Sequence, residues 1–199
     1  MMVMEEGPLP EAVLPVQELR DQLRLGAADA GTADGLLATH LRAAMAAVEA
    51  RTGKVLIRRP FRLRLADWYG VEGLPLPLAP VSAVDELAML GVDGTRQVVD
   101  PALWRLAEDL HRPRIVALGG WRPVVPDGGG VEIGLTAGFA ATWQGVPADL
   151  RHAVMLLAAR YHEDRVEGGY GGANPLPFGV TALIEPYRSV RILGGRGRR

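Results

Sequence analysis

Residues 35–65 read GLLATHLRAAMAAVEARTGKVLIRRPFRLRL, and the spacing of their apolar side chains changes once, at Gly53. Before Gly53 the apolar residues recur every three or four positions, as on one face of an α-helix, and these are Leu37, Leu41, Ala44, Met45 and Val48. After Gly53 they occupy alternate positions, as in a β-strand with one buried face, and these are Val55, Ile57, Phe61, Leu63 and Leu65. Glycine is the usual residue just beyond a helix end. The stretch therefore predicts a helix over about 33–52 followed directly by a strand.

The other face of this strand carries three arginines, Arg58, Arg62 and Arg64. Such a row is typical of an exposed sheet face, and it is also compatible with a surface that meets DNA or a neighbouring subunit. We take the three as candidate subunit-interface or lumen-facing residues. Pro60 has no backbone N–H to donate, so it predicts that the strand lies at a sheet edge or is interrupted there.

Further helical patterns flank this stretch, over about 15–25, 147–166 and 180–187. The first begins at Pro15, which a first helical turn tolerates, and forms a helical hairpin with the helix at 33–52. The longest has Asp149 in its first turn, where the helix dipole favours a negative charge. Together these patterns predict a small helical bundle, made of the hairpin and a long C-terminal helix.

Between the helices, the chain contains short alternating runs separated by glycine and proline. The clearest run is 131–139, and shorter ones lie at 81–91, 103–106 and 114–118. Residues 74–80 hold three prolines and predict an extended connector. The predicted fold class is therefore α+β, with an antiparallel β module over about 54–140 inserted into the helical bundle.

The two ends of the chain differ in charge. We expect an N-terminal arm over 1–14 with several acidic residues, a single domain over 15–190 and a flexible basic tail over 191–199. Beyond Glu185 every charged side chain is an arginine, and these are Arg188, Arg191, Arg196, Arg198 and Arg199. Glycine-spaced arginines can neutralise phosphates or dock against an acidic groove of a protein, and the alternative is a disordered solubilising end.

Composition excludes several classes of protein. The chain has 199 residues, 48% of them apolar, and a formal net charge of −1, which fits one folded domain and not a surface that binds polyanions throughout. It has 0 cysteines, which excludes disulfides, thiol nucleophiles and cysteine-ligated metal sites. Residues 1–15 lack the positive region of a signal peptide, and the longest apolar run, 153–159, is far shorter than the roughly 20 residues of a bilayer span. We expect a soluble protein with no membrane partner.

The residue types and spacings of the chain match no familiar catalytic pattern. Neither Ser82 nor Ser189 lies in a Gly-x-Ser-x-Gly motif, and no two histidines have the i, i+4 spacing of a helical zinc site. The densest titratable group, around His162 and Glu163, is interpreted as a solvated charged turn, and a hydrolase using these two residues is a further alternative. We predict no catalytic residues, no metal site and no cofactor.

Several motifs occur in a characteristic order: residues 19–25, GLL at 35–37 with EARTG at 49–53, LAPV at 78–81, LTAGF at 135–139, VPADL at 146–150, LPFGV at 176–180 and PYR at 186–188. In these motifs the chain resembles the head-tail connector (adaptor) proteins of tailed bacteriophages and of phage-derived gene transfer agents. The resemblance covers about residues 15–190.

The resemblance implies a non-enzymatic structural protein at the head-tail junction of a phage or phage-like particle assembled in the bacterial cytoplasm. Its copies would form a ring, typically dodecameric, between the portal protein of the DNA-filled head and a downstream stopper or tail connector protein. DNA would pass through the lumen without sequence recognition. The C-terminal segment would reach into the portal, and the residues that would bind it are Tyr187, Arg188, Arg191, Arg196, Arg198 and Arg199. The main alternative is a small DNA-binding module that uses the arginine-rich C-terminal tail.

Overall fold

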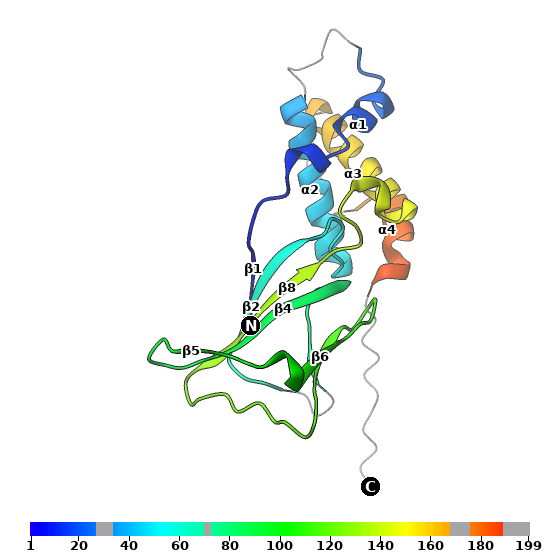
Figure 1. Cartoon of the computed structure of the whole chain (residues 1–199). Helices are drawn as coiled ribbons and strands as arrows, with labels where there is room; N and C mark the ends of the chain where they lie inside the picture. Colours follow the sequence, from blue (N-terminus) through cyan, green and yellow to red (C-terminus); the bar gives the residue numbers. More distant parts are fainter. Residues whose placement is uncertain (27–33, 70–72, 168–175, 189–199) are drawn as a thin grey trace.

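Helices and sheets occupy opposite ends of the molecule in the computed structural model (Figure 1). The structure describes residues 1–26, 34–69, 73–167 and 176–188. The fold is α+β, as the two apolar periodicities predict. The elements in chain order, with η for 3-10 helices, are β1 (Met2–Glu5), η1 (Glu11–Val13), α1 (Val16–Gln22), α2 (Asp34–Thr52), β2 (Arg59–Leu65), β3 (Leu74–Pro75), β4 (Val81–Leu90), β5 (Arg96–Val98), η3 (Pro101–Leu103), β6 (Trp104–Ala107), β7 (Arg114–Ala117), β8 (Gly130–Ala137), η4 (Trp143–Gly145), α3 (Ala148–Glu167), α4 (Phe178–Ile184) and η5 (Glu185–Tyr187).

The helical end is built on α2 and α3, which pack against each other, while α1 contacts both and α4 packs on α3. The apolar stripe of α2 faces inward, so that Leu37 and Leu41 are fully buried. Ala153 and Ala158 on α3 are also fully buried, and such small side chains let neighbouring helices approach closely. The apolar residues that recur with helical spacing in the sequence are therefore the ones buried in this core.

The sheet end consists of a five-stranded antiparallel sheet in the order β1-β2-β8-β4-β5 and a three-stranded sheet in the order β3-β7-β6. Apolar residues of both sheets share one core, including Leu63 of β2, Ile133 of β8 and Ile115 of β7. The central strand β8 pairs with β2 on one side and β4 on the other, so it fixes the register of the larger sheet.

A short segment joins the two cores. Gly53 ends α2 with a left-handed backbone (φ 68°), which an L side chain rarely adopts. Directly after it, Val55 packs into the sheet core, whereas Leu56 and Ile57 pack into the helical core. The helical and sheet ends are thus held together by consecutive residues of one segment.

Of the two outcomes predicted from Pro60, the sheet edge is wrong, because β1 covers β2 on the side opposite β8, whereas an interruption is found, because the pairing with β1 stops next to Pro60. The pairing of β1 with β2 ends at Glu5 and Phe61. Beyond that pair, the Pro60 carbonyl accepts a hydrogen bond from the N–H of Glu6 (3.1 Å). The nitrogen of Pro60 faces the same side but carries no hydrogen, so the reciprocal hydrogen bond to Glu6 cannot form and the ladder with β1 ends there.

Three short strands are missing from the predicted elements. Strand β1 lies in the segment expected to be an N-terminal arm, β3 lies in the expected connector, and β5 follows the turn after β4. They contain 4, 2 and 3 residues respectively. Runs of two or three residues show too few alternations for a twofold period to be recognised, and the four residues of β1 lie in a segment whose acidic residues and prolines predict an arm.

Candidate assembly surfaces

The C-terminal end of the described chain is anchored to the domain by Tyr187. Its hydroxyl donates a hydrogen bond to Oδ1 of Asp149 (2.9 Å) in the first turn of α3. Its ring packs edge-on against Phe139, with the ring centroids 5.9 Å apart. Burial, together with the hydrogen bond and the negative charge of Asp149, raises the pKa of Tyr187 to about 12. The hydroxyl therefore stays protonated at neutral pH and keeps its donor role.

Only two of the six residues predicted to bind a portal, Tyr187 and Arg188, belong to the described part of the chain. Arg188 follows the anchor, and its Nη1 contacts Glu185 Oε2 at 2.9 Å in an exposed pair that adds little stability. The other four lie outside the described residues, and these are Arg191, Arg196, Arg198 and Arg199. The structure thus places Tyr187 and Arg188 at the root of the segment.

The arginine face of β2 is organised around a glutamate on the neighbouring strand. Glu132 of β8 pairs in register with Arg64, and its side chain is only 3% exposed. Its Oε2 accepts a hydrogen bond from Arg64 Nε (2.7 Å), and its Oε1 accepts one from Arg62 Nη1 (2.9 Å) and one from Arg96 Nε (3.1 Å). Two arginines of β2 and one of β5 therefore meet at one carboxylate of β8.

Two further glutamates complete this group. Glu6 accepts a hydrogen bond from Arg62 Nε (2.6 Å), and Glu86 forms an ion pair with Arg96. We call the group the sheet-face cluster, and its members are Arg62, Arg64, Arg96, Glu6, Glu86 and Glu132. Burial opposes the ionisation of Glu132, but hydrogen bonds from the three arginines outweigh it and hold its pKa below the usual range. With three positive and three negative groups, the cluster is neutral overall.

Arg58 does not join the sheet-face cluster. It precedes β2 and is exposed, and among the described residues it forms no ion pair. The structure thus separates Arg58 from Arg62 and Arg64, which the alternation had grouped together. Glu132 carried a signal in the sequence, since it is a lone carboxylate in the alternating run 131–139, but its arginine partners depend on strand register.

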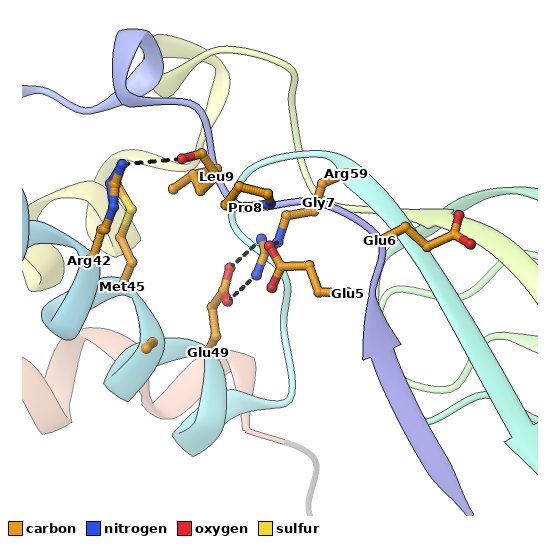
Figure 2. Close-up of a pocket in the computed structure, with 10 residues that line it drawn as sticks. Glu5, Glu6, Gly7, Pro8, Leu9, Arg42, Met45, Glu49 and Arg59 are labelled. Atoms are coloured by element: carbon orange, nitrogen blue, oxygen red, sulfur yellow. Dashed lines mark hydrogen bonds and ion pairs between the residues drawn. The ribbon is translucent and has the colours of Figure 1, made fainter.

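A pocket of about 600 Å³ lies between residues 5–9, here called the N-terminal strap, and helix α2 (Figure 2). Arg59 organises its charged lining, with Nη2 donating to Glu49 (2.7 Å) and Nε 2.8 Å from Glu5. Burial acts to lower the pKa of Arg59, but Glu49 and Glu5 outweigh it and raise the pKa. The apolar lining consists of Gly7, Pro8, Leu9, Met45 and Ala46. The pocket had no signal in the sequence, because the strap and α2 are far apart along the chain.

The groups considered for catalysis do not form a recognisable reaction centre in the described part of the chain. The ring of His162 packs edge-on against that of His40, with the ring centroids 5.8 Å apart, while Glu163 is exposed. Within the described ranges, no three His, Cys, Asp or Glu side chains are grouped so as to hold a metal ion. A search of the described helices finds none with the length and apolar character needed to cross a membrane.

Comparison with known proteins gives a consistent result from solved structures. No protein-family model matches the chain, and no curated protein matches it. A chain in the structure "Neck of empty GTA particle computed with C6 symmetry" is 50% identical, with a TM-score of 0.88, and the match covers 99% of this chain and 100% of that one. A chain in "Virion of native gene transfer agent (GTA) particle" is also 50% identical with the same coverage and a TM-score of 0.86.

A third structure, "Neck of native GTA particle computed with C12 symmetry", contains a chain that is 48% identical, with a TM-score of 0.83 and the same coverage. The cyclic symmetries of these necks support a ring oligomer within a particle. The similarity extends over the whole domain, including the sheet and helical ends and the segment that joins them. This chain therefore belongs to the family of neck proteins of gene transfer agent particles, as a structural component of the head-tail junction.

Proposed function

We propose that this chain is the adaptor of the neck, a ring-forming protein that joins the portal of a DNA-filled head to the next connector or tail component. The observation that carries the proposal is the near-complete match, at 48–50% identity, to neck chains in assemblies of C6 and C12 symmetry. A dodecamer is the copy number that fits both symmetries with equivalent subunits. DNA would pass through the lumen of this ring without sequence-specific contacts.

The C-terminal segment supplies the contact with the portal in this proposal. Tyr187, fixed to Asp149, holds the root of the segment, so that the arginines beyond it start from a defined point on each copy. Each copy then offers the same weak basic contact to one symmetric partner. Simultaneous engagement of many such contacts raises the overall affinity by orders of magnitude without any strong single contact.

The sheet-face cluster suits a surface that DNA moves past better than one that holds DNA. Because Arg62 and Arg64 already pair with Glu132, their charges are not available to neutralise phosphates unless those pairs break. Arg58 is the member of the predicted set that remains available for a subunit or for the lumen. The alternative of a small DNA-binding module consequently gains nothing from Arg62 and Arg64 and relies on the C-terminal arginines.

Deletion of residues 194–199 tests the role of the tail. We expect the shortened chain to fold normally, because the deleted residues are glycine and arginine and contribute no apolar surface to a core. Attachment to the portal should weaken at least about tenfold, since three positive charges per copy are lost. Co-sedimentation with portal rings measures attachment, and circular dichroism checks the fold.

A matched variant with Arg196, Arg198 and Arg199 changed to glutamine keeps the length of the tail and removes only its charge. It should behave as the deletion does. Normal portal attachment by both variants would contradict the proposed role of the tail. A mobility shift of duplex DNA by the isolated full chain, without any binding to portal rings, would instead favour the DNA-binding alternative.

A further inference from the structure

The most exposed large apolar side chain among the described residues is Phe178, which is 87% exposed in the first turn of α4. Its neighbours in that helix, Val180 and Ile184, are fully buried in the helical core, so the orientation of the helix is set without Phe178. An aromatic side chain left in water forgoes a large apolar burial, and an exposed aromatic of this kind commonly serves as an interface anchor. No other described residue of the chain covers Phe178, and we call this protruding side chain the knob.

The pocket beneath the N-terminal strap offers a matching recess. Pro8 and Leu9 line it on the strap side, and Met45 of α2 lies across from them (Figure 2). Ala46 of α2 also lines the pocket. Its volume of about 600 Å³ accommodates a phenyl ring. A recess that combines apolar side chains with a few charged groups is a surface that a partner is expected to fill.

The charges of the pocket disfavour an anionic group and leave one guanidinium able to face an aromatic ring. Its lining includes three glutamates and two arginines, so an additional carboxylate would be repelled. Arg59 is paired with Glu5 and Glu49, whereas within the described ranges Arg42 donates only a long hydrogen bond, from Nη2 to the Leu9 carbonyl (3.3 Å). Its Nη1 is buried without a hydrogen-bond partner in the described chain. The face of an aromatic ring attracts such a guanidinium.

The knob and the pocket lie on opposite flanks of the molecule. In Figure 1 helix α4 is on one side of the α2–α3 pair, and the N-terminal strap is on the other side, at a similar level along the long axis. A ring with cyclic symmetry requires a heterologous contact between two different patches of each copy. Two complementary patches on opposite flanks satisfy that requirement, whereas two copies of one patch would close as a dimer.

We propose that Phe178 of one copy inserts into the strap pocket of the next copy, and that this contact closes the ring. The inference rests on the proposed function, because it takes the neighbour to be a second copy of this chain within the neck. The contact makes the N-terminal strap part of the subunit interface. It also leaves the C-terminal segment, which starts after η5, available for the portal.

A photoreactive analogue tests the contact directly. The full chain carrying p-benzoylphenylalanine at position 178 is assembled into particles, illuminated, and analysed by gel electrophoresis and mass spectrometry. We expect a ladder of multimers, with position 178 joined to the strap or to the Met45 region of another copy. The same analogue at Val124, which is 80% exposed at the sheet end, is the control and should not label the pocket.

The cross-linking results distinguish failure of the proposed contact from failure of the adaptor proposal. Cross-links from position 178 to the portal, to another neck protein or to its own copy overturn the contact but leave the adaptor proposal standing. Particles whose unmodified necks contain no ring of this chain would overturn the adaptor proposal itself.

Complementation between two variants gives a second test. Phe178→Ala removes the knob and Ala46→Trp fills the pocket, and each should weaken self-association at least about tenfold. Because each variant keeps one intact patch, a mixture of the two should form a heterodimer that does not grow further. Both substitutions lie at exposed positions, so the fold should be retained. Normal rings from either variant alone would overturn the inference.

Discussion

The outer face of the five-stranded sheet and the junction between helices and sheet both bury a charged side chain, with opposite consequences. On the sheet face, Glu132 is 3% exposed and is surrounded by three arginines that hydrogen-bond it. At the junction, Lys54 follows Gly53 and is 1% exposed, and its Nζ has no hydrogen-bond partner among the described residues. In the described chain one buried charge is hydrogen-bonded on both oxygens and the other has no hydrogen bond.

The difference shows in the direction of the two pKa shifts. The arginines lower the pKa of Glu132 and favour its charged form. Burial lowers the pKa of Lys54, which disfavours its charged form, and the attraction of Asp109 offsets this only in part. A buried charge therefore stabilises this fold where neighbouring strands supply partners, and destabilises it where the chain only passes between two cores.

The largest expected effect is from Glu132→Gln. The substitution keeps the shape of the side chain but leaves three guanidinium groups facing a neutral amide. The free energy of unfolding should fall, because three guanidinium groups lose their charged partner. Because the arginines are partly exposed and can be rehydrated, the loss should be limited to about 2–3 kcal/mol. Urea denaturation measures it. A loss below about 0.5 kcal/mol would mean that the sheet-face cluster is electrostatically unimportant.

The pH dependence of unfolding, compared between the wild type and Glu132→Gln, tests whether the ionised form of Glu132 is responsible for this loss. The folded pKa of Glu132 is below its ordinary value of 4.5, so its contribution is complete above that value and disappears as the pH falls through the folded pKa. The stability difference between wild type and Glu132→Gln should be constant near neutral pH and shrink in acid. A difference that does not change down to acid unfolding would contradict the role of ionised Glu132.

A smaller effect of opposite sign is expected from Lys54→Met. Methionine has a similar length and needs no hydrogen-bond partner, so the variant should be more stable by about 1–2 kcal/mol at neutral pH. Because burial places the folded pKa of Lys54 below its ordinary value of 10.5, the gain should shrink as the pH rises toward that value. Thermal unfolding at two pH values measures both. A destabilised variant would indicate that the ammonium has a partner after all.

The smallest effect is expected from Arg64→Ala. The side chain of Arg64 is 54% exposed, and Glu132 retains Arg62 and Arg96, so the loss should be below about 1 kcal/mol. Arg58→Ala is the matched control, since Arg58 forms no ion pair in the described chain, and should leave stability unchanged. A loss from Arg64→Ala as large as that from Glu132→Gln would show that one arginine carries the whole cluster.

The candidate surfaces were accessible to sequence reasoning to different degrees. Tyr187 and Arg188 lie in a motif near the basic end of the chain, and a reader of the sequence can single them out without a structure. Glu132 is visible as a lone charge in an alternating strand, but nothing in the sequence connects it to Arg62 or Arg96. The strap pocket and the position of Phe178 opposite it depend entirely on how distant segments pack.

The apolar periodicities by themselves determined the α+β class, the positions of α2, α3, β4 and β8, and the stop at Gly53, because each is a local property of neighbouring residues. Tertiary structure alone decided that β1 covers β2, that three arginines meet one glutamate, and that Lys54 is buried with no hydrogen-bond partner among the described residues. These features depend on strand register and on contacts between segments far apart in the chain, and no local pattern encodes them. The same residue type, arginine, consequently completes a neutral cluster on the sheet face and remains a separate charge at Arg58.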